Sequence, residues 1–127
     1  MIQHADLVGD WANAAGASVH IAADHSLTAS GIDHAVPDYT CSANIAAGRW
    51  RFYVQDRSSQ TLTDPESATE GESFTVTTGT ASSTGRPCYL EAQVRSDDQG
   101  FNICLVLDPD QTCTAEELLR KAPPRPH

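Results

Sequence analysis

The sequence predicts an all-β protein built from antiparallel strands, and two observations support this class. Apolar residues recur at every second position in several segments, which is the period of a strand with one buried face. Short stretches rich in Gly, Asp, Ser, Asn and Pro separate these segments and favour turns. A length of 127 residues suits a single domain. We expect that domain over residues 1–122, followed by a disordered tail at 123–127.

The first hairpin is expected between residues 17 and 32. Val19 and Ile21 alternate with polar or small residues, 23–26 offers turn chemistry, and 27–32 runs back.

The clearest strand follows at 48–55, where Trp50, Phe52 and Val54 share one face that we expect to point inward. Residues 56–72 have the composition of an exposed connection, with room for a short strand at 60–63. Phe74, Val76 and Thr78 then alternate with Ser73, Thr75 and Thr77, and we expect Phe74 and Val76 to point inward.

A second hairpin is expected around a turn centred on Asp98 and Gln99. This turn aligns the apolar residues of the two strands, which supports the register. The expected pairs are Val94 with Ile103, Ala92 with Leu105, and Leu90 with Leu107.

The C-terminal segment allows two structures. Thr114 to Glu117 fits a capping box, and good helix formers follow as far as Pro123, which favours a short helix. A turn at 108–111 would instead let 112–121 return as the last strand. The sequence leaves both open.

Four cysteines form an even set, as expected for two disulfides in an oxidising compartment. The register places Cys104 on the outward face, and a further turn at 109–110 would put Cys113 diagonal to it on that face. We therefore expect Cys104–Cys113 and Cys41–Cys88. They close about 10 and about 48 residues, worth roughly 2.7 and 4 kcal/mol in the chain-entropy model. Buried free thiols remain an alternative, whereas zinc is disfavoured because no Cys-x-x-Cys pair is present. We therefore expect a secreted or extracytoplasmic protein whose signal peptide is not part of these residues.

The chain is acidic, with 17 Asp and Glu against 8 Lys and Arg and a formal charge of -9. The negative electrostatic potential of such a chain makes nucleic acid and anionic membrane surfaces poor partners. No apolar run approaches the roughly 18 residues of a membrane span, so membrane insertion is not expected.

Several short motifs are similar to those of small lipocalin-like (calycin) β-barrel proteins, secreted or lipid-anchored, from actinobacteria. They are Leu-Val-Gly-Asp-Trp at 7–11, the hairpin at 22–31, Gly-Arg-Trp at 48–50, and Asp-Pro-Asp at 108–110 followed by 118–120. The resemblance implies one antiparallel up-and-down barrel of about eight strands. It also implies that Trp11 packs beneath Arg120 in a cation–π contact worth ~1 kcal/mol. Residues 7–13 resemble the opening strand of avidin as well, but Ala17 stands where that family has a biotin-binding Ser, so biotin is not expected.

An eight-stranded barrel is just wide enough to be filled by its own side chains or to hold one small ligand. A solid core is one possibility. The leading functional hypothesis is a binding protein for a small hydrophobic molecule held inside the barrel. The residues expected to contact that molecule are Trp50, Phe52, Phe74, Leu90, Ala92 and Leu105.

Two other functions remain open: a cofactor-free cyclase or isomerase that works inside the barrel, and an interaction or inhibitor protein that binds through loops 33–43 and 56–72. Catalysis is disfavoured because no Gly-x-Ser-x-Gly elbow and no phosphate loop occur. No cofactor is expected. A metal site built from His25, His34, Asp24 and Asp33 is conceivable, but solvated turn residues are commoner, so no metal is expected either.

Overall fold

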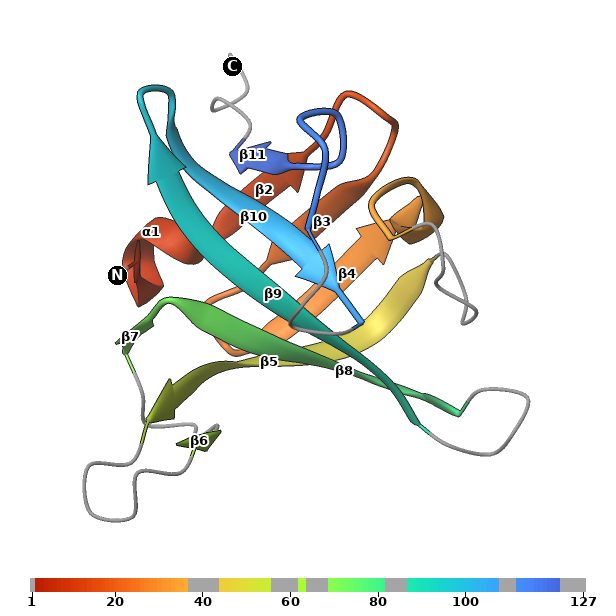
Figure 1. Cartoon of the computed structure of the whole chain (residues 1–127). Helices are drawn as coiled ribbons and strands as arrows, with labels where there is room; N and C mark the ends of the chain where they lie inside the picture. Colours follow the sequence, from red (N-terminus) through yellow and green to blue (C-terminus); the bar gives the residue numbers. More distant parts are fainter. Residues whose placement is uncertain are drawn as a thin grey trace, which may run out of the picture.

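A computed structural model describes residues 2–36, 44–55, 62–63, 69–81, 87–107 and 112–121. The chain forms a closed barrel of eight antiparallel strands (Figure 1). Each barrel strand pairs with the next one along the chain, and the last pairs with the first, so the meander closes on itself. The predicted all-β, up-and-down barrel is confirmed. The barrel strands are β2 (Gly9–Ala12), β3 (Ser18–Ile21), β4 (Ser26–Ser30), β5 (Ile45–Gln55), β8 (Ser73–Ala81), β9 (Pro87–Asp97), β10 (Gly100–Val106) and β11 (Leu119–Lys121).

Five shorter elements lie outside the barrel wall. They are β1 (Ile2–Gln3), α1 (His4–Leu7), the 3-10 turn η1 (Ile32–His34), β6 (Leu62–Thr63) and β7 (Glu70–Gly71). β1 pairs with β7, so the N-terminal segment is tied to the connection that leads into β8. No helix in the described ranges is long and apolar enough to cross a membrane.

The hairpin of β3 and β4 forms where the sequence predicts it. Asp24 closes the turn by accepting hydrogen bonds from the backbone N–H and the hydroxyl of Ser26. These bonds lower the pKa of Asp24 below its usual value. His25 takes a positive φ of 71°, a conformation that a tight turn requires.

The hairpin of β9 and β10 has the predicted two-residue turn, because Asp97 pairs with Gly100 across Asp98 and Gln99. Val94 faces Ile103 and Ala92 faces Leu105, as expected. The expected pairing of Leu90 with Leu107 is wrong: the ladder ends at Val106, and Leu107 is 39 % exposed.

The C-terminal segment ends as a strand. β11 pairs with β10 on one side and with β2 on the other, so it supplies the closure of the barrel. The capping-box contact also forms, because Glu117 Oε1 accepts a hydrogen bond from the Thr114 backbone N–H at 2.9 Å. It caps one turn at 115–117 and not the short helix that local propensity allows. Strand pairing on both edges outweighs the helical preference of a few residues.

The predicted disulfide between Cys104 and Cys113 is confirmed, with the two sulfur atoms 2.06 Å apart and the Cα atoms 5.8 Å apart. Cys41 and the side chain of Cys88 lie outside the described residues, so their pairing stays a prediction. The same holds for most of loops 33–43 and 56–72 and for the tail at 123–127.

Trp11 is buried in the barrel end, as expected, but Arg120 does not cover it. The Trp11 indole N–H donates to the Leu7 carbonyl at 2.8 Å, and Trp11 lies opposite Lys121 in the ladder. Lys121 passes over Gly9 and donates to the Asp6 carbonyl at 2.8 Å. Arg120 is one residue out of register with Trp11 and therefore points to the outer face of the sheet.

Candidate functional site

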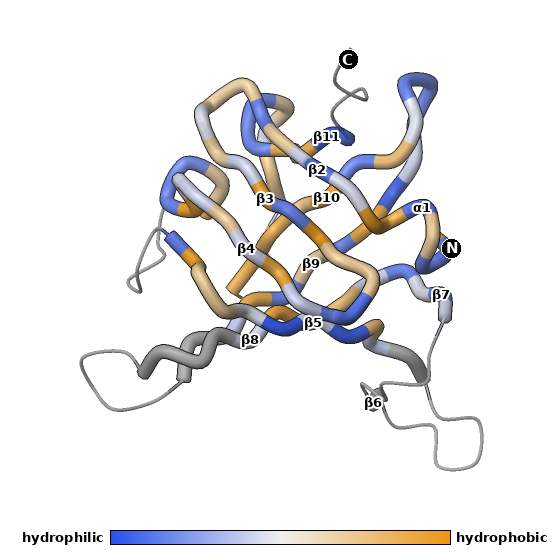
Figure 2. Tube along the Cα trace, turned by 180° about the vertical axis from the view of Figure 1, so that it is seen from behind, coloured by the Kyte–Doolittle hydropathy of each residue, from blue (hydrophilic) through white to orange (hydrophobic). Residues whose placement is uncertain are grey.

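The interior brings together all six residues that the sequence predicts for a ligand. Trp50 contacts Phe52 and Phe74 edge to face, with ring centroids 5.3 and 5.9 Å apart. Apolar and polar residues alternate along β3 and β4, whose apolar side chains line the same interior (Figure 2). All six are almost completely buried: Trp50, Phe52, Phe74, Leu90, Ala92 and Leu105.

The barrel interior is nevertheless filled. The free space enclosed between its apolar side chains is about 10 Å³, which is close to the volume of one water-sized sphere. Its lining includes Phe74, Leu90 and Leu105. Between these described side chains, a molecule larger than water therefore has no preformed place, and it would have to displace them.

Two histidines pack on Trp50 at the end of the barrel that α1 covers. The His4 ring lies 5.1 Å from Trp50 and 5.2 Å from His25, and the His25 ring lies 4.8 Å from Trp50. The Trp50 indole N–H donates to the Ala22 carbonyl at 3.0 Å. The His4 Nε2 atom is buried without a hydrogen-bond partner in the described structure. The N-terminal segment thus covers the largest interior ring.

The cluster of His25 and His34 that the sequence left as a less favoured alternative does not form. His25 packs on Trp50, whereas His34 lies beside its neighbour Asp33 at 3.9 Å. Among the residues that the structure describes, no group of three His, Cys, Asp or Glu side chains is placed to hold a metal ion.

The larger open spaces lie on the outside of the barrel. The first hollow, of about 470 Å³, lies along β9 near its turn with β10 and is bordered by outward residues of β9 together with Val94 and Ser96 from the other face of that strand. Glu91, Gln93 and Arg95 alternate with inward residues there, so their side chains share one face. The hollow is bordered by Ile2, Glu72, Ser73, Glu91, Gln93, Val94, Arg95, Ser96 and Phe101.

A second hollow, of about 240 Å³, adjoins the first on the β10 side. The disulfide holds the segment 112–118 against β10, and this segment forms the far wall. Both hollows share Gln93, Arg95 and Ser96, so Arg95 stands between them. The second hollow is bordered by Gln93, Arg95, Ser96, Asn102, Cys104, Thr112, Cys113 and Leu118.

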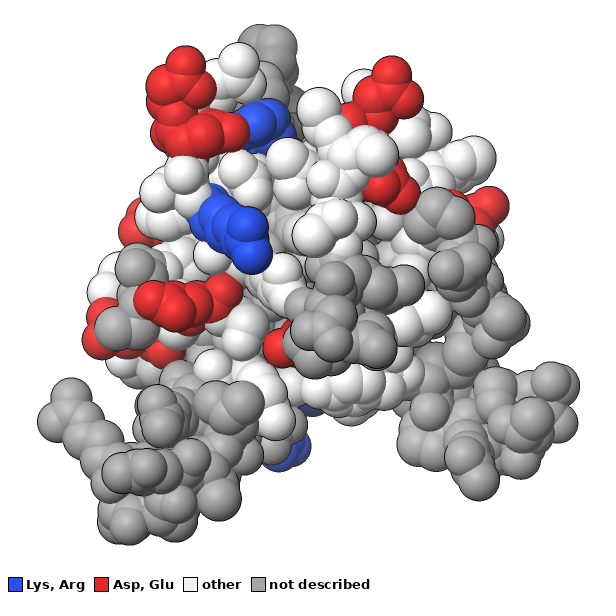
Figure 3. All heavy atoms as spheres, viewed as in Figure 1, with Lys and Arg blue, Asp and Glu red and all other residues white. Residues whose placement is uncertain are grey.

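The charges around the first hollow are not paired with one another. Arg95 and Glu72 are exposed and Glu91 is half-buried, and none of the three makes a hydrogen bond or ion pair through its side chain with a described residue. Basic and acidic side chains lie side by side over this part of the surface (Figure 3). One guanidinium and two carboxylates therefore remain available to a bound molecule.

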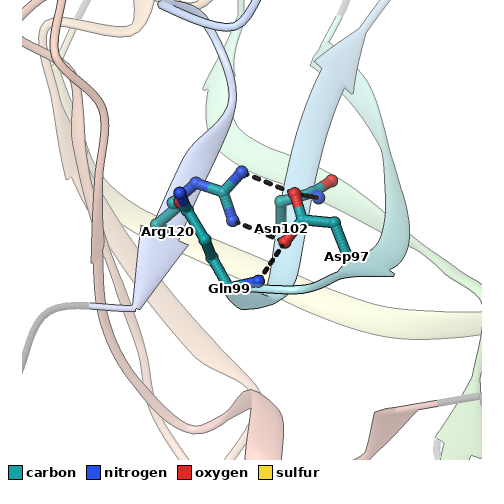
Figure 4. Close-up of polar contacts among 4 residues, drawn as sticks. All are labelled: Asp97, Gln99, Asn102 and Arg120. Atoms are coloured by element: carbon teal, nitrogen blue, oxygen red, sulfur yellow. Dashed lines mark hydrogen bonds and ion pairs between the residues drawn. The ribbon is translucent and has the colours of Figure 1, made fainter.

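Asp97 is the next acidic residue on the same face of β9, and its carboxylate binds Arg120 and the β9–β10 turn. Arg120 binds its two carboxylate oxygens at 3.1 and 2.7 Å, and the Gln99 backbone N–H and the Asn102 amide donate to them at 2.9 and 3.3 Å (Figure 4). The hydrogen bonds from Arg120 and Gln99 lower the pKa of Asp97, and Asp97 raises the pKa of Arg120. This network fixes the β9–β10 turn to β11, and it leaves Arg95 without a carboxylate.

Comparisons with protein-family models, curated proteins and solved structures give no match to this chain.

The sequence analysis missed the two hollows. The alternation along 88–95 does predict that Glu91, Gln93 and Arg95 face outward, so the signal was present. The wall made by 112–118 and the choice of Arg120 as the partner of Asp97 depend on tertiary contacts, and no local pattern encodes them.

Proposed function

We propose that the protein is an extracytoplasmic binding protein in which a filled, lipocalin-like barrel serves as a rigid scaffold. Its ligand is a small polar molecule that binds in the two hollows flanking Arg95. The observation that carries this proposal is a difference in volume: the first hollow measures about 470 Å³, whereas the space enclosed between the apolar side chains of the interior measures about 10 Å³. The outer volume lies in the range of small-molecule sites.

Two further features support the proposal. The Cys104–Cys113 disulfide suits an oxidising, extracytoplasmic setting. It also anchors one wall of the site to β10, so the second hollow is held open by a covalent bond rather than by a free loop.

Binding is favoured over catalysis by the groups that border the hollows. These are a guanidinium, carboxylates, hydroxyls and amides; no histidine and no free thiol occurs among the described lining residues. Such groups recognise a polar molecule, whereas an activated nucleophile needs an adjacent base.

The test is an NMR titration of the ¹⁵N-labelled protein with glycine, glycylglycine, glucose and maltotriose. We expect at least one compound to shift the backbone amides of β9 and β10 around Arg95, and we expect Arg95→Gln to weaken that response. Arg49→Gln, which removes the same charge from the outer face of β5 where that strand pairs with Ser26 of β4, should leave it intact. Absence of any shift at these amides would refute the proposal.

The function expected from the sequence, a small hydrophobic molecule inside the barrel, is a second candidate. One observation favours it: the aromatic cluster of Trp50, Phe52 and Phe74 forms a continuous apolar lining. It requires the interior to expand, because the enclosed space is so small. Shifts of interior amides on addition of naphthalene, together with quenching of tryptophan emission, would favour this candidate over the outer site.

A further inference from the structure

Resting on the proposed function, we propose that the ligand is a short basic peptide with both ends free. Three or four residues lie extended along β9, with the terminal carboxylate on Arg95 and the terminal ammonium group near Glu91. The geometry and charge of the first hollow point to this class of ligand.

The distance between Glu91 and Arg95 determines the length of the peptide that can reach both. Glu91 and Arg95 are four residues apart on one face of β9, so their Cα atoms are separated by about 13 Å at the usual rise of a strand. An extended peptide of three or four residues spans about 10–14 Å. Its two charged ends therefore match Arg95 and Glu91, whereas a single amino acid reaches only one of them.

The signs of the charges around the first hollow determine which charged groups the peptide should carry. The hollow carries two carboxylates, from Glu72 and Glu91, and one guanidinium, from Arg95. A complementary ligand carries two ammonium groups and one carboxylate, which describes a peptide with one lysine. The formal charge of -9 on the whole chain also favours a ligand of net positive charge.

Arg95 suits the carboxylate end. Its planar guanidinium presents parallel N–H donors that match the two oxygens of a carboxylate. Because it makes no side-chain hydrogen bond with a described residue, no existing ion pair has to break when the ligand binds. The hydroxyl of Ser73, which pairs with Gln93 on the same outward face, is suited to a hydrogen bond with the peptide backbone.

The experiment measures dissociation constants by NMR titration for the tripeptide Ala-Lys-Ala and for its C-terminal amide. We expect the amide to bind the unaltered protein at least about fivefold more weakly, as expected for the loss of one partly exposed charge pair of ~1 kcal/mol. Arg95→Gln should weaken the free-acid peptide by a similar factor and should no longer distinguish it from the amide. Glu91→Gln should weaken both peptides while keeping their ratio.

Two variants serve as controls. Arg49→Gln and Asp33→Asn make the same charge changes at exposed positions that border neither hollow, and they should change neither constant. The dispersion of the amide spectrum reports whether each variant is folded.

Equal affinity for the acid and the amide, or persistent discrimination in Arg95→Gln, would overturn the inference. The two proposals fail separately. If glucose or maltotriose shifts the β9 and β10 amides and the peptide does not, the outer binding site stands and the peptide assignment is wrong. If no probe shifts them, both are wrong.

Discussion

Replacing Leu90 with alanine tests whether the barrel interior is a filled core. Leu90 is 1 % exposed and borders the enclosed space of about 10 Å³. Removing three carbon groups loses about 2.4 kcal/mol of burial at about 0.8 kcal/mol each. The neighbouring strands are held by ladder hydrogen bonds and collapse little, so a cavity term adds to this loss. We expect a total of about 4 kcal/mol, in the upper half of the range for such substitutions.

The assay is urea denaturation followed by tryptophan fluorescence, combined with NMR detection of benzene binding. The enlarged cavity of Leu90→Ala should bind benzene, as dry apolar cavities do, whereas the unaltered protein should not. Leu107→Ala makes the same chemical change at a 39 % exposed position and should cost less than about 1 kcal/mol. Benzene binding inside the unaltered protein, or equal losses in the two variants, would refute the filled core.

Three further predictions concern contacts described above. The pKa of Asp97 is lowered in the folded protein, so the hydrogen bonds of its carboxylate stabilise the fold above about pH 4, and this stabilisation is lost on further acidification. Urea denaturation at pH 7 and pH 3 should therefore show a smaller acid-induced loss of stability for Asp97→Asn than for the unaltered protein. An equal loss of stability would contradict this. His4→Phe keeps a ring on Trp50 and removes the buried nitrogen that has no hydrogen-bond partner in the described structure, so it should raise stability by about 1 kcal/mol in the same assay. His20→Phe, which loses an exposed hydrogen bond to Asp10, should not raise it. Replacing Cys104 and Cys113 together with serine should lower stability by about 2.7 kcal/mol, and peptide mapping without reductant should recover the link between them in the unaltered protein.

The strand registers could be predicted because one face of each strand is buried. A slip of one residue would move Val94 and Ile103 to solvent, so the apolar alternation and the two-residue turn together allow one alignment. The same reasoning placed Cys104 on the outer face and led to its pairing with Cys113. It failed at Leu107, because alternation alone does not show where a strand ends.

The state of the interior could not be predicted in the same way. A pattern of apolar residues shows which side chains point inward, but not whether their volumes fill the space. Trp50, Phe52 and Phe74 have the composition of a ligand pocket, and here their rings pack on one another. The position of Arg120 was missed for a related reason: the resemblance placed it over Trp11, whereas β11 pairs Lys121 with Trp11 and Arg120 with Ala12.

The closure of the barrel also determines which charges remain available on its surface. Arg95 and Asp97 are two residues apart on the same face of β9, a spacing at which their side chains are neighbours. β11 closes the barrel beside β10 and brings Arg120 onto both oxygens of Asp97. That contact holds the last strand in place and removes the nearest carboxylate from the reach of Arg95. The strand that closes the barrel therefore leaves the Arg95 guanidinium, which lies between the two hollows, without an ion-pair partner among the described residues. The proposed site and its specificity for a carboxylate both depend on this feature.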